Sequence, residues 1–331
     1  MNTRIDAVAE AHNAMSREYD QLNDLWYPWL YSQIHTVIAE QLRRADKPEK
    51  GKSLDVGCGT GFQTFLTSHF GYDSIGIDIA GDLIELARSK KSQFCVEAMP
   101  PLFHSNIKNS WLSEHNEWLS NTARFSRSNL PLGKVEFDWG SAEEMNFSPS
   151  TFDVITCCGS VLSFIEDYPA VVNKMTEMLR PRGLLFVEVE QRYTVDLLWA
   201  IVDRLTGNRL GYRQTLGEAW KNLFANRNLQ IEINYPFELQ NGQEVFLPIR
   251  LFDIDHLESL WKSNGLSVIS RTGVHSLTNI IPSVLLHQPE PSRLRSKLFS
   301  VFRHFEAKVG EIWPFWRLGC SVIYTLRKNN D

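Results

Sequence analysis

The chain has 331 residues, of which 43% are hydrophobic and 22% charged, and its formal net charge at pH 7 is −5. This length can hold one large α/β domain or two smaller ones, and the composition is that of an ordinary globular protein. The mild acidic excess gives no overall attraction for nucleic acid. The cysteines number five and form no C-x-x-C pair, so neither a disulfide framework nor a metal site is expected.

Residues 1–50 are expected to form a helical cap, because apolar residues between positions 25 and 42 recur at helical spacing. The polar start of the chain has no apolar signal segment, and no apolar run approaches the length of a membrane span. We therefore expect a cytoplasmic protein and no membrane partner. The sequence does not indicate an oligomeric state.

Short apolar strands then alternate with helical stretches, which predicts an α/β fold with a Rossmann-like open sheet. We expect this sheet to be mostly parallel with an antiparallel last strand, and helices on both faces. Residues 51–90 and 134–192 form its core and 253–331 its C-terminal part. The expected strands are 53–56, 74–77, 134–138, 152–158, 184–190, 266–272 and 321–327. The main expected helices are 62–70, 82–90, 168–180, 254–263 and 292–311.

Two insertions interrupt this alternation. Residues 91–133 are predicted to form a lid with one amphipathic helix near 106–124. Residues 193–252 are predicted to form a substrate cap, with a helix and a hairpin whose turn is Asn241–Gly242. We place both at the carboxyl ends of the strands, where open α/β sheets bind ligands. Together the insertions carry the aromatic residues Trp111, Trp118, Trp199, Trp220 and Phe224.

A glycine-rich turn follows the first strand, in the segment "LDVGCGTG" (Leu54–Gly61). Its G-x-G-x-G spacing differs from the G-x-G-x-x-G of dinucleotide sites. Asp55 precedes the first glycine, and a carboxylate there would repel a pyrophosphate but suits a cationic ligand such as the methionine end of S-adenosylmethionine. Asp78 closes the second strand, where an acidic residue can accept hydrogen bonds from ribose hydroxyls. The combination favours S-adenosylmethionine over NAD or FAD.

At these residues the sequence resembles the class I S-adenosylmethionine-dependent methyltransferases. "LDVGCGTG" is similar to the first motif of that family and "IGIDIA" (Ile75–Ala80) to the second. The blocks Gly140–Asp167 and Leu179–Val189 resemble those that follow. The resemblance covers residues 50–90 and 134–190 well and the last two strands loosely. It implies S-adenosyl-L-methionine as cofactor, S-adenosyl-L-homocysteine as product, and no metal.

The resemblance also implies a set of cofactor-binding residues. Asp78 would hold the ribose, Ile79 would lie beside the adenine, and Tyr19 would reach the methionine end. Ser141 stands where family members commonly have an Asp for the adenine amino group, which leaves the backbone of Ala142 to serve it. The full expected set is Tyr19, Asp55, Gly57, Cys58, Gly59, Gly61, Asp78, Ile79, Ser141, Ala142 and Cys158.

The acceptor is expected to be a small, apolar or aromatic metabolite, for example one of natural-product biosynthesis. The Asn/Asp-Pro-Pro-aromatic motif of the methyltransferases that modify exocyclic amines of nucleic acids is missing, and "CCGSVLSF" stands in its place. Candidate acid–base residues are Glu190, which shares a strand face with Glu188, Tyr193 just after it, and His275 after the sixth strand. None is a convincing base, so we slightly favour methylation of nitrogen over oxygen.

Two alternatives stay open. A methyltransferase fold can lose its activity and act as a binding protein. The segment 292–311 is basic on one side and apolar on the other, as in an enzyme that works at a membrane surface on a lipid or quinone acceptor. Packing of this apolar side on the sheet is the simpler expectation.

Overall fold

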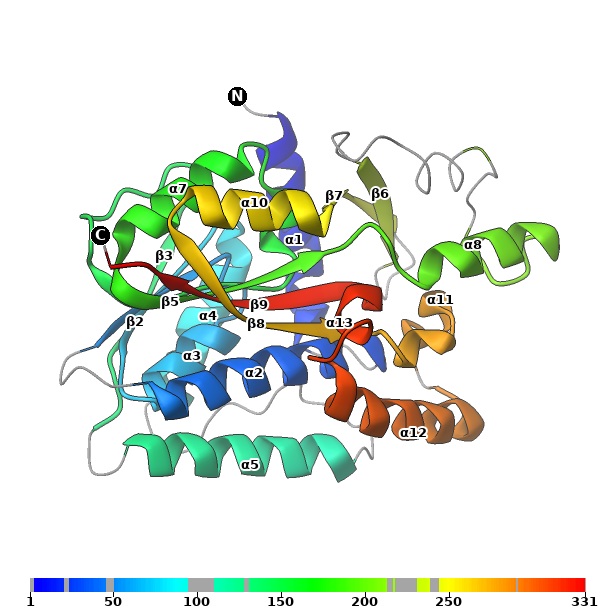
Figure 1. The fold of residues 1–331 in the computed structure, drawn as a ribbon, viewed down its shortest axis with the longest axis horizontal. Helices are drawn as coiled ribbons and strands as arrows, with labels where there is room; N and C mark the ends of the chain where they lie inside the picture. Colours follow the sequence, from blue (N-terminus) through cyan, green and yellow to red (C-terminus); the bar gives the residue numbers. More distant parts are fainter. Residues whose placement is uncertain are drawn as a thin grey trace.

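The computed structural model describes residues 3–20, 24–45, 51–94, 110–127, 131–212, 217, 231–238, 244–289 and 291–330. These residues form a central sheet between two layers of helices (Figure 1). The chain begins with helices α1 (Thr3–Tyr19) and α2 (Trp26–Arg44), as predicted for the N-terminal segment.

The central sheet has seven strands in the order β3-β2-β1-β4-β5-β9-β8. Strands β1 to β5 run parallel, and β9 lies antiparallel between β5 and β8. The predicted sheet with its antiparallel last strand is therefore confirmed. The strands are β1 (Lys52–Val56), β2 (Asp73–Asp78), β3 (Val135–Trp139), β4 (Phe152–Cys157), β5 (Leu179–Glu190), β8 (Leu266–Val274) and β9 (Ser321–Lys328).

Helices cover both faces of this sheet (Figure 1). Successive residues of a strand point to opposite faces, so Phe186 packs in the core with α2 and α3, whereas Leu185 and Val187 pack in the core with α7 and α10. The remaining elements are α3 (Phe62–His69), α4 (Gly81–Phe94), α5 (Ser110–Arg127), α6 (Val161–Phe164), α7 (Tyr168–Met178), α8 (Asp196–Leu205), α10 (Ile254–Ser263), η1 (Thr278–Ile280), α11 (Ser283–Leu286), α12 (Arg293–Val309) and α13 (Phe315–Leu318).

Helix α10 begins where the sequence predicts. Asp253 has an extended backbone, and its carboxylate accepts hydrogen bonds from the backbone N–H groups of Asp255 and His256. These N–H groups have no partner inside the helix, so a carboxylate at this position stabilises the first turn. The helix then buries Ile254, Leu257 and Trp261 against the sheet.

The first insertion contains one described helix, close to the amphipathic helix that the sequence predicts. Its described part, α5, packs on α2 and α3 and forms an outer layer below the sheet (Figure 1). Trp111 meets the ring of Trp29 edge-on, at a centroid distance of 5.9 Å, and Trp118 is 37% exposed. An amphipathic helix covers whichever apolar surface its neighbours leave open, and here that surface is α2. Residues 95–109, in the same insertion, lie outside the described residues.

The second insertion contains the predicted hairpin, formed by β6 (Ile231–Glu238) and β7 (Glu244–Leu251). Its turn, Asn241–Gly242, lies outside the described residues, as do Trp220 and Phe224. Strand β7 packs on α1, where Leu247 contacts Ala11 and Met15. The hairpin and α1 thus lie near each other at the carboxyl end of the sheet, where β5 continues into α8.

Among the described helices, none combines the length and the apolar character needed to cross a lipid bilayer.

Candidate active site

The glycine turn joins β1 to α3 in a conformation that requires glycine. Gly57 has φ +69°, and a Cβ added there would lie 2.3 Å from Val161 Cγ2. The N–H groups of Gly57 and Cys58 both donate to the carbonyl of Ile77, at 2.9 Å. Because these bonds tie the turn to β2, the ends of the first two strands form one rigid edge.

Asp78 lies at this edge, at the end of β2. Its Oδ2 accepts from the N–H of Gly59 and its Oδ1 from the N–H of Ala80, each at 2.8 Å. The side chain is 8% exposed, and burial raises the pKa of its carboxyl above the ordinary value. The two backbone bonds fix its orientation and leave further lone pairs on both oxygens.

A cavity opens beside this turn, and we call it the turn cavity. Several of the residues expected to bind the cofactor line it, and they come from α1, the turn, the end of β2 and the segment after β3. These residues are Tyr19, Gly57, Gly59, Asp78, Ile79, Ser141 and Ala142. Residues of α1 that the sequence did not suggest, Ile5, Val8 and His12, also line it. Their helical spacing of three and four was the available signal.

Asp55 does not line the turn cavity. Its carboxylate is buried beneath the turn, where Oδ1 accepts from Thr156 Oγ1 and Oδ2 from Thr64 Oγ1, both at 2.7 Å. Burial raises its pKa to about 6, although these hydrogen bonds oppose the shift. The structure thus places Asp55 as an anchor for β4 and α3, and any effect on a cationic ligand would act through space.

Three further residues that were expected to bind the cofactor also lie behind the wall of the turn cavity. Cys58 is buried against Phe65 and Phe137, and Cys158 belongs to the core with α2. Gly61, with φ +92°, stands at the start of α3, where an added Cβ would lie 2.7 Å from Phe137. The structure does not bring these three side-chain positions to the ligand space.

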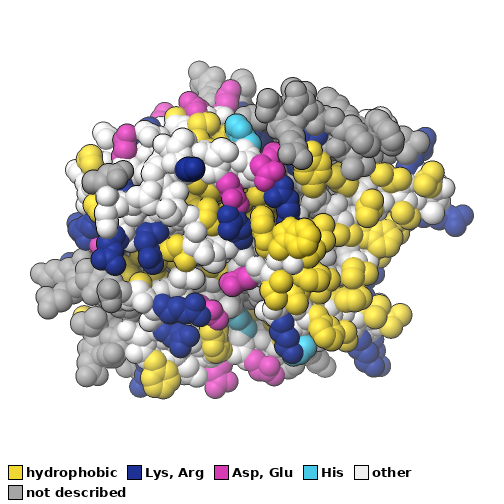
Figure 2. Space-filling model, in the orientation of Figure 1, with side chains coloured by type: hydrophobic (Ala, Val, Ile, Leu, Met, Phe, Trp, Pro, Cys, Tyr) yellow, Lys and Arg dark blue, Asp and Glu magenta, His cyan; other side chains and the backbone are white. Residues whose placement is uncertain are grey.

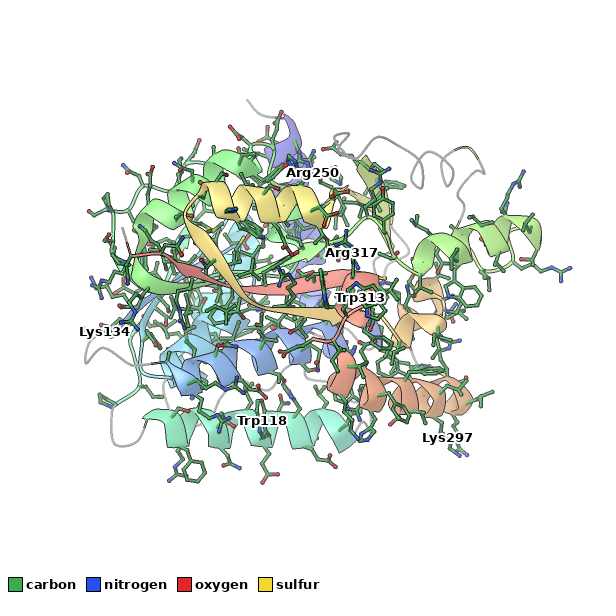
Figure 3. All side chains as sticks on the ribbon, in the orientation of Figure 1. Trp118, Lys134, Arg250, Lys297, Trp313 and Arg317 are labelled. Atoms are coloured by element: carbon green, nitrogen blue, oxygen red, sulfur yellow. The ribbon has the colours of Figure 1, made fainter. Side chains whose placement is uncertain are left out.

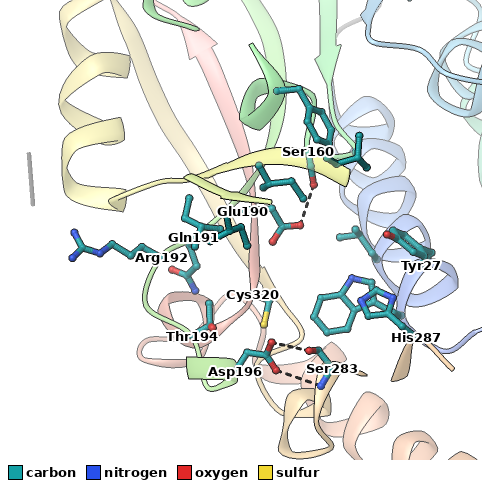
Figure 4. Close-up of a pocket in the computed structure, with 18 of the residues that line it drawn as sticks. Tyr27, Ser160, Glu190, Gln191, Arg192, Thr194, Asp196, Ser283, His287 and Cys320 are labelled. Atoms are coloured by element: carbon teal, nitrogen blue, oxygen red, sulfur yellow. Dashed lines mark hydrogen bonds between the residues drawn. The ribbon is translucent and has the colours of Figure 1, made fainter. Parts of the chain in front are cut away.

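A second, larger cavity of about 180 Å³ adjoins the first, and we call it the large cavity (Figure 4). Its wall is mostly apolar and aromatic, and includes Met15, Trp26, Leu30, Leu197 and Leu247. These residues come from α1, α2, α8 and β7, so the wall exists only once the chain has folded. A largely apolar wall with few polar groups is typical of a small-molecule site.

The two cavities share part of their walls. His12, Tyr19, Gly159 and Phe164 line both. Tyr19 Oη is hydrogen-bonded to Tyr31 Oη at 2.7 Å, and burial raises the pKa of Tyr19 to about 12. Both phenols therefore stay neutral at physiological pH. A ligand in the turn cavity would meet a second ligand in the large cavity at this wall.

Glu190 is the acidic residue of the large cavity that lies at the end of β5 (Figure 4). Its Oε1 accepts from Ser160 Oγ at 3.0 Å. Burial, reinforced by the negative charge of Glu188, raises the pKa of Glu190 to about 8. A carboxyl with this pKa can hold a proton at neutral pH and release it just above, which is the range useful for acid–base catalysis.

Glu188 and Glu190 lie on the same face of β5, as predicted. Unlike Glu190, Glu188 binds the backbone of the turn after β4. Its Oε2 accepts from the N–H groups of Gly159 and Ser160, at 3.0 and 2.6 Å. Those residues have left-handed backbones, with φ +86° and +60°. Glu188 thus holds the turn after β4 in the conformation that directs Ser160 toward Glu190.

Neither of the other two acid–base candidates is brought to a cavity. His275 is fully buried, stacked on Trp26 at 3.7 Å, and its ring nitrogens face Thr278 Oγ1 and the carbonyl of Trp26. Burial keeps its pKa well below the ordinary value. Tyr193 is 37% exposed beside the guanidinium of Arg192, and it is not among the described residues that line either cavity. Residues that follow a strand can turn back into the core or out to solvent, and sequence does not distinguish the two.

A polar group that the sequence did not suggest lies at the other end of the large cavity (Figure 4). Asp196 Oδ2 accepts from Ser283 Oγ at 2.7 Å, and its Oδ1 accepts from Tyr212 Oη. Cys320, just before β9, also lines the cavity. Of these residues, only Cys320 could have been placed here from the sequence. It lies at the start of an antiparallel strand, and such a start lies at the carboxyl edge of the neighbouring parallel strands.

The two cavities adjoin along a shared wall. The described residues contain no cluster of three or more His, Cys, Asp or Glu side chains that could hold a metal ion. A family model described as a methyltransferase domain matches residues 30–271, which include the turn cavity's glycines, Asp78 and Glu190.

Two relatives with assigned names each match about half of the chain. A ubiquinone biosynthesis O-methyltransferase of Methylococcus capsulatus is 26% identical over 172 residues, which are 52% of this chain and 53% of that protein. A demethylmenaquinone methyltransferase of Bacillus mycoides is 26% identical over 182 residues, 54% of this chain and 60% of the relative. The matched part therefore spans little more than half of either relative.

Solved structures with a similar course of the chain include two methyltransferases described as S-adenosylmethionine-dependent. One, from Methanosarcina mazei, has a TM-score of 0.47 and 15% identity, and the alignment covers 86% of this chain and 95% of that one. The other is a putative enzyme from Listeria monocytogenes, with a TM-score of 0.46, 14% identity, and coverage of 91% and 99%.

Proposed function

Because the chain belongs to the S-adenosylmethionine-dependent methyltransferase domains, we propose that it transfers a methyl group to a ring hydroxyl of a small, largely apolar acceptor. The observation that carries this proposal is the junction of the two cavities at Tyr19, Gly159 and Phe164. One cavity has the polar groups for the cofactor, and the other has a mostly apolar wall with the carboxyl of Glu190 near the junction and that of Asp196 at the other end.

The residues of the turn cavity fit S-adenosylmethionine. Asp78 offers carboxylate oxygens at the end of β2, as two ribose hydroxyls require, while Ile79 and Ala142 line the same space with small apolar surface suited to adenine. Gly57 and Gly59 let the ligand approach the backbone closely. When bound, the cofactor supplies a methyl group made electrophilic by its sulfonium.

Glu190 supports the choice of a hydroxyl acceptor. A phenol-like hydroxyl becomes a better nucleophile when a base removes its proton, and a carboxylate whose pKa is raised to about 8 is a stronger base than an ordinary one. The proton would pass from the acceptor oxygen to a carboxylate oxygen of Glu190, while Ser160 Oγ keeps that carboxylate oriented. The sequence slightly favours methylation of nitrogen only because no residue in it is a convincing base. With Glu190 as the base, that argument for nitrogen no longer applies.

The class of acceptor follows from the wall of the large cavity. Trp26, Tyr31 and Phe164 offer aromatic surface, and Leu30, Leu197 and Leu247 offer aliphatic surface. Aromatic rings with apolar substituents fit such a wall. The names of the two relatives point to quinone-type rings, and we propose a hydroxylated aromatic or quinol-like ring for this chain.

Two measurements test this proposal. Calorimetric titration with S-adenosylmethionine, S-adenosylhomocysteine and NAD should give binding of the first two only. Transfer of a radiolabelled methyl group should then be measured with catechol, hydroquinone and aniline acceptors that carry short alkyl chains. We expect labelled methyl ethers from the hydroxyl acceptors.

Other outcomes have defined meanings. Methylated anilines without ethers would contradict the hydroxyl acceptor and restore the nitrogen alternative. Cofactor binding without transfer to any acceptor, together with acceptor binding, would indicate a silent binding protein. Binding of NAD alone would overturn the assignment of the turn cavity.

A further inference from the structure

Exposed apolar side chains gather on one part of the surface. Among the described residues, eleven of the seventeen large hydrophobic side chains that are exposed lie in α8, η1, α12 and the segment 312–318. Figure 2 shows these regions as a concentration of hydrophobic side chains on the side of the molecule where α8, α11, α12 and α13 lie. Single exposed apolar residues are ordinary, but a contiguous group of this kind indicates a binding surface.

Helix α12 carries two apolar stripes. The inner one contains Phe299, which is 1% exposed, together with Phe302, and packs on the protein core as the sequence led us to expect. The outer stripe was not predicted from the sequence. It consists of Leu294, Leu298, Val301 and Phe305, which recur at intervals of four, three and four. Their exposed fractions range from 44% to 68%.

The neighbouring elements continue the outer stripe. Helix α8 exposes Leu198, Val202 and Leu205, and the segment after α12 exposes Ile312 and Trp313. The indole N–H of Trp199 donates to the carbonyl of Asn279 at 2.9 Å, and α12 packs on both η1 and α13. These contacts join the elements into one surface, which we call the apolar face.

The charges around the apolar face are basic. Segments 196–211 and 291–318 together contain eight Lys or Arg and four Asp or Glu. The whole chain, by contrast, has 34 Lys or Arg and 39 Asp or Glu. Of those four acids, Asp203 and Glu306 are buried, and Asp196 is hydrogen-bonded inside the large cavity. The exposed charges beside the face are therefore mainly positive, and Figure 3 labels one of them, Lys297, on α12 below Trp313.

We propose that the apolar face docks on the surface of an anionic lipid bilayer. Apolar stripes flanked by Lys and Arg, with a tryptophan at the border, match the layers of such a surface, where acyl chains lie beneath anionic headgroups. A second copy of the chain fits less well, because pairing two α12 helices would bring Arg293, Lys297 and Lys308 against like charges. An acidic protein partner would need a matching apolar surface of its own to cover the outer stripe of α12, whereas a bilayer supplies apolar and anionic layers together.

The apolar face adjoins the large cavity. Helix α8 exposes Leu198 and Val202 on one side and lines the cavity with Leu197 and Ala200 on the other. Ser283, in α11 beside η1, also lines the cavity. Docking would place the cavity next to the lipid, so an acceptor with a long apolar tail could enter without crossing water. This last step rests on the proposed function, whereas bilayer docking does not.

The test uses the full-length chain and vesicles without any acceptor. Co-sedimentation should be measured with vesicles of phosphatidylcholine alone and with vesicles in which roughly a third of the lipid is phosphatidylglycerol. We expect the chain to pellet with the anionic vesicles and to dissociate as salt is raised. The double variant Leu298→Gln/Phe305→Gln should bind at least about tenfold more weakly, because it removes apolar surface without changing charge.

Controls separate this proposal from its alternatives. Phe125→Gln removes a side chain that is 82% exposed on α5, away from the apolar face, and should leave vesicle binding unchanged. Arg293→Gln/Lys297→Gln should weaken binding to anionic vesicles only. Calorimetric titration with S-adenosylmethionine should give one affinity for all variants, since none of them lines the turn cavity.

Two results would overturn bilayer docking. One is equal pelleting of the wild type and Leu298→Gln/Phe305→Gln with anionic vesicles. The other is no pelleting, combined with a dimer in sedimentation velocity that this double variant dissociates, which would identify a second copy as the occupant. Failure of the proposed function would look different, since vesicle binding would persist while S-adenosylmethionine binding or methyl transfer to a short-chain hydroquinone was absent.

Discussion

The turn cavity and the large cavity meet at one wall, but they are built in different ways. The glycine turn and the end of β2 are two short stretches that form the part of the turn cavity around Asp78, and the bonds that fix Asp78 are made to the backbone. The large cavity draws its wall from α1, α2, β5, β7, α8 and α11, and its polar groups are side chains.

This difference indicates how the two sites can vary. Backbone bonds and glycines at the end of a strand tolerate few substitutions, because each position has a required conformation. A wall of side chains from separate elements can change one residue at a time while the sheet remains the same. We therefore expect the turn cavity to determine the cofactor and the large cavity to determine the acceptor.

The largest expected effect would separate the two cavities by activity. Glu190→Gln should lower kcat/KM about 100-fold or more and leave calorimetric affinity for S-adenosylmethionine unchanged. In the wild type, a base with a pKa of about 8 is active only when deprotonated, so kcat/KM should rise with pH and level off above 8. The Gln variant should lose this rise.

The matched control is Glu166→Gln, which changes an exposed glutamate outside both cavities. Its pH profile should follow the wild type. A wild-type profile that stays flat between pH 6 and 9 would rule out Glu190 as the base.

The next effect concerns the cofactor alone. Asp78→Ala should weaken S-adenosylmethionine binding by about 1.5–3 kcal/mol for each charge-assisted hydrogen bond lost, measured by calorimetry. Asp138→Ala removes the same charge from an exposed position on β3 and should have little effect. Equal affinities of the two variants would show that Asp78 does not hold the ribose.

A smaller effect concerns Asp55 and the stability of the cofactor-free protein. Burial raises its pKa from 3.8 to about 6, so folding favours the protonated form, and the stability that this gives is lost as pH rises through 6. Asp55→Asn cannot ionise and escapes this loss. The free energy of unfolding should shift in favour of the variant by about 1.4 kcal/mol between pH 5 and pH 8, because only the last unit of the rise from 3.8 to about 6 lies in this interval.

Urea unfolding of both proteins at pH 5, 6, 7 and 8 measures this shift. A difference between variant and wild type that is the same at every pH would mean that Asp55 titrates normally in the folded state.

The smallest expected effect lies at the shared wall. Tyr31→Phe removes the 2.7 Å hydrogen bond to Tyr19, a bond between two neutral hydroxyls. Unfolding experiments should give a loss of about 0.5–1.5 kcal/mol. Tyr193→Phe, at a partly exposed residue, should give no measurable loss. If Tyr31→Phe also raises the KM values of both ligands, the wall positions cofactor and acceptor together.

The sequence by itself determined the core of the fold and the position of the glycine turn and of Asp78. The alternation of strands and helices, the glycine turn and the position of Asp78 are each encoded within a few tens of neighbouring residues, and the structure has them where the sequence places them. Local patterns of this kind survive folding, because backbone geometry and hydrophobic periodicity depend on near neighbours.

The tertiary structure alone decided which candidates reach the ligand space. His275 and Tyr193 follow a strand, as the segment with Asp196 does, yet the first packs in the core, the second faces solvent and the third lines the large cavity. Asp196 meets Ser283, 87 residues away, and Glu190 meets Ser160, 30 residues away. Helix α5 is a further example, because its apolar side packs on α2 and not at the carboxyl edge of the sheet. Such contacts depend on how whole elements pack, because an apolar or polar side chain accepts any complementary surface that the fold brings near.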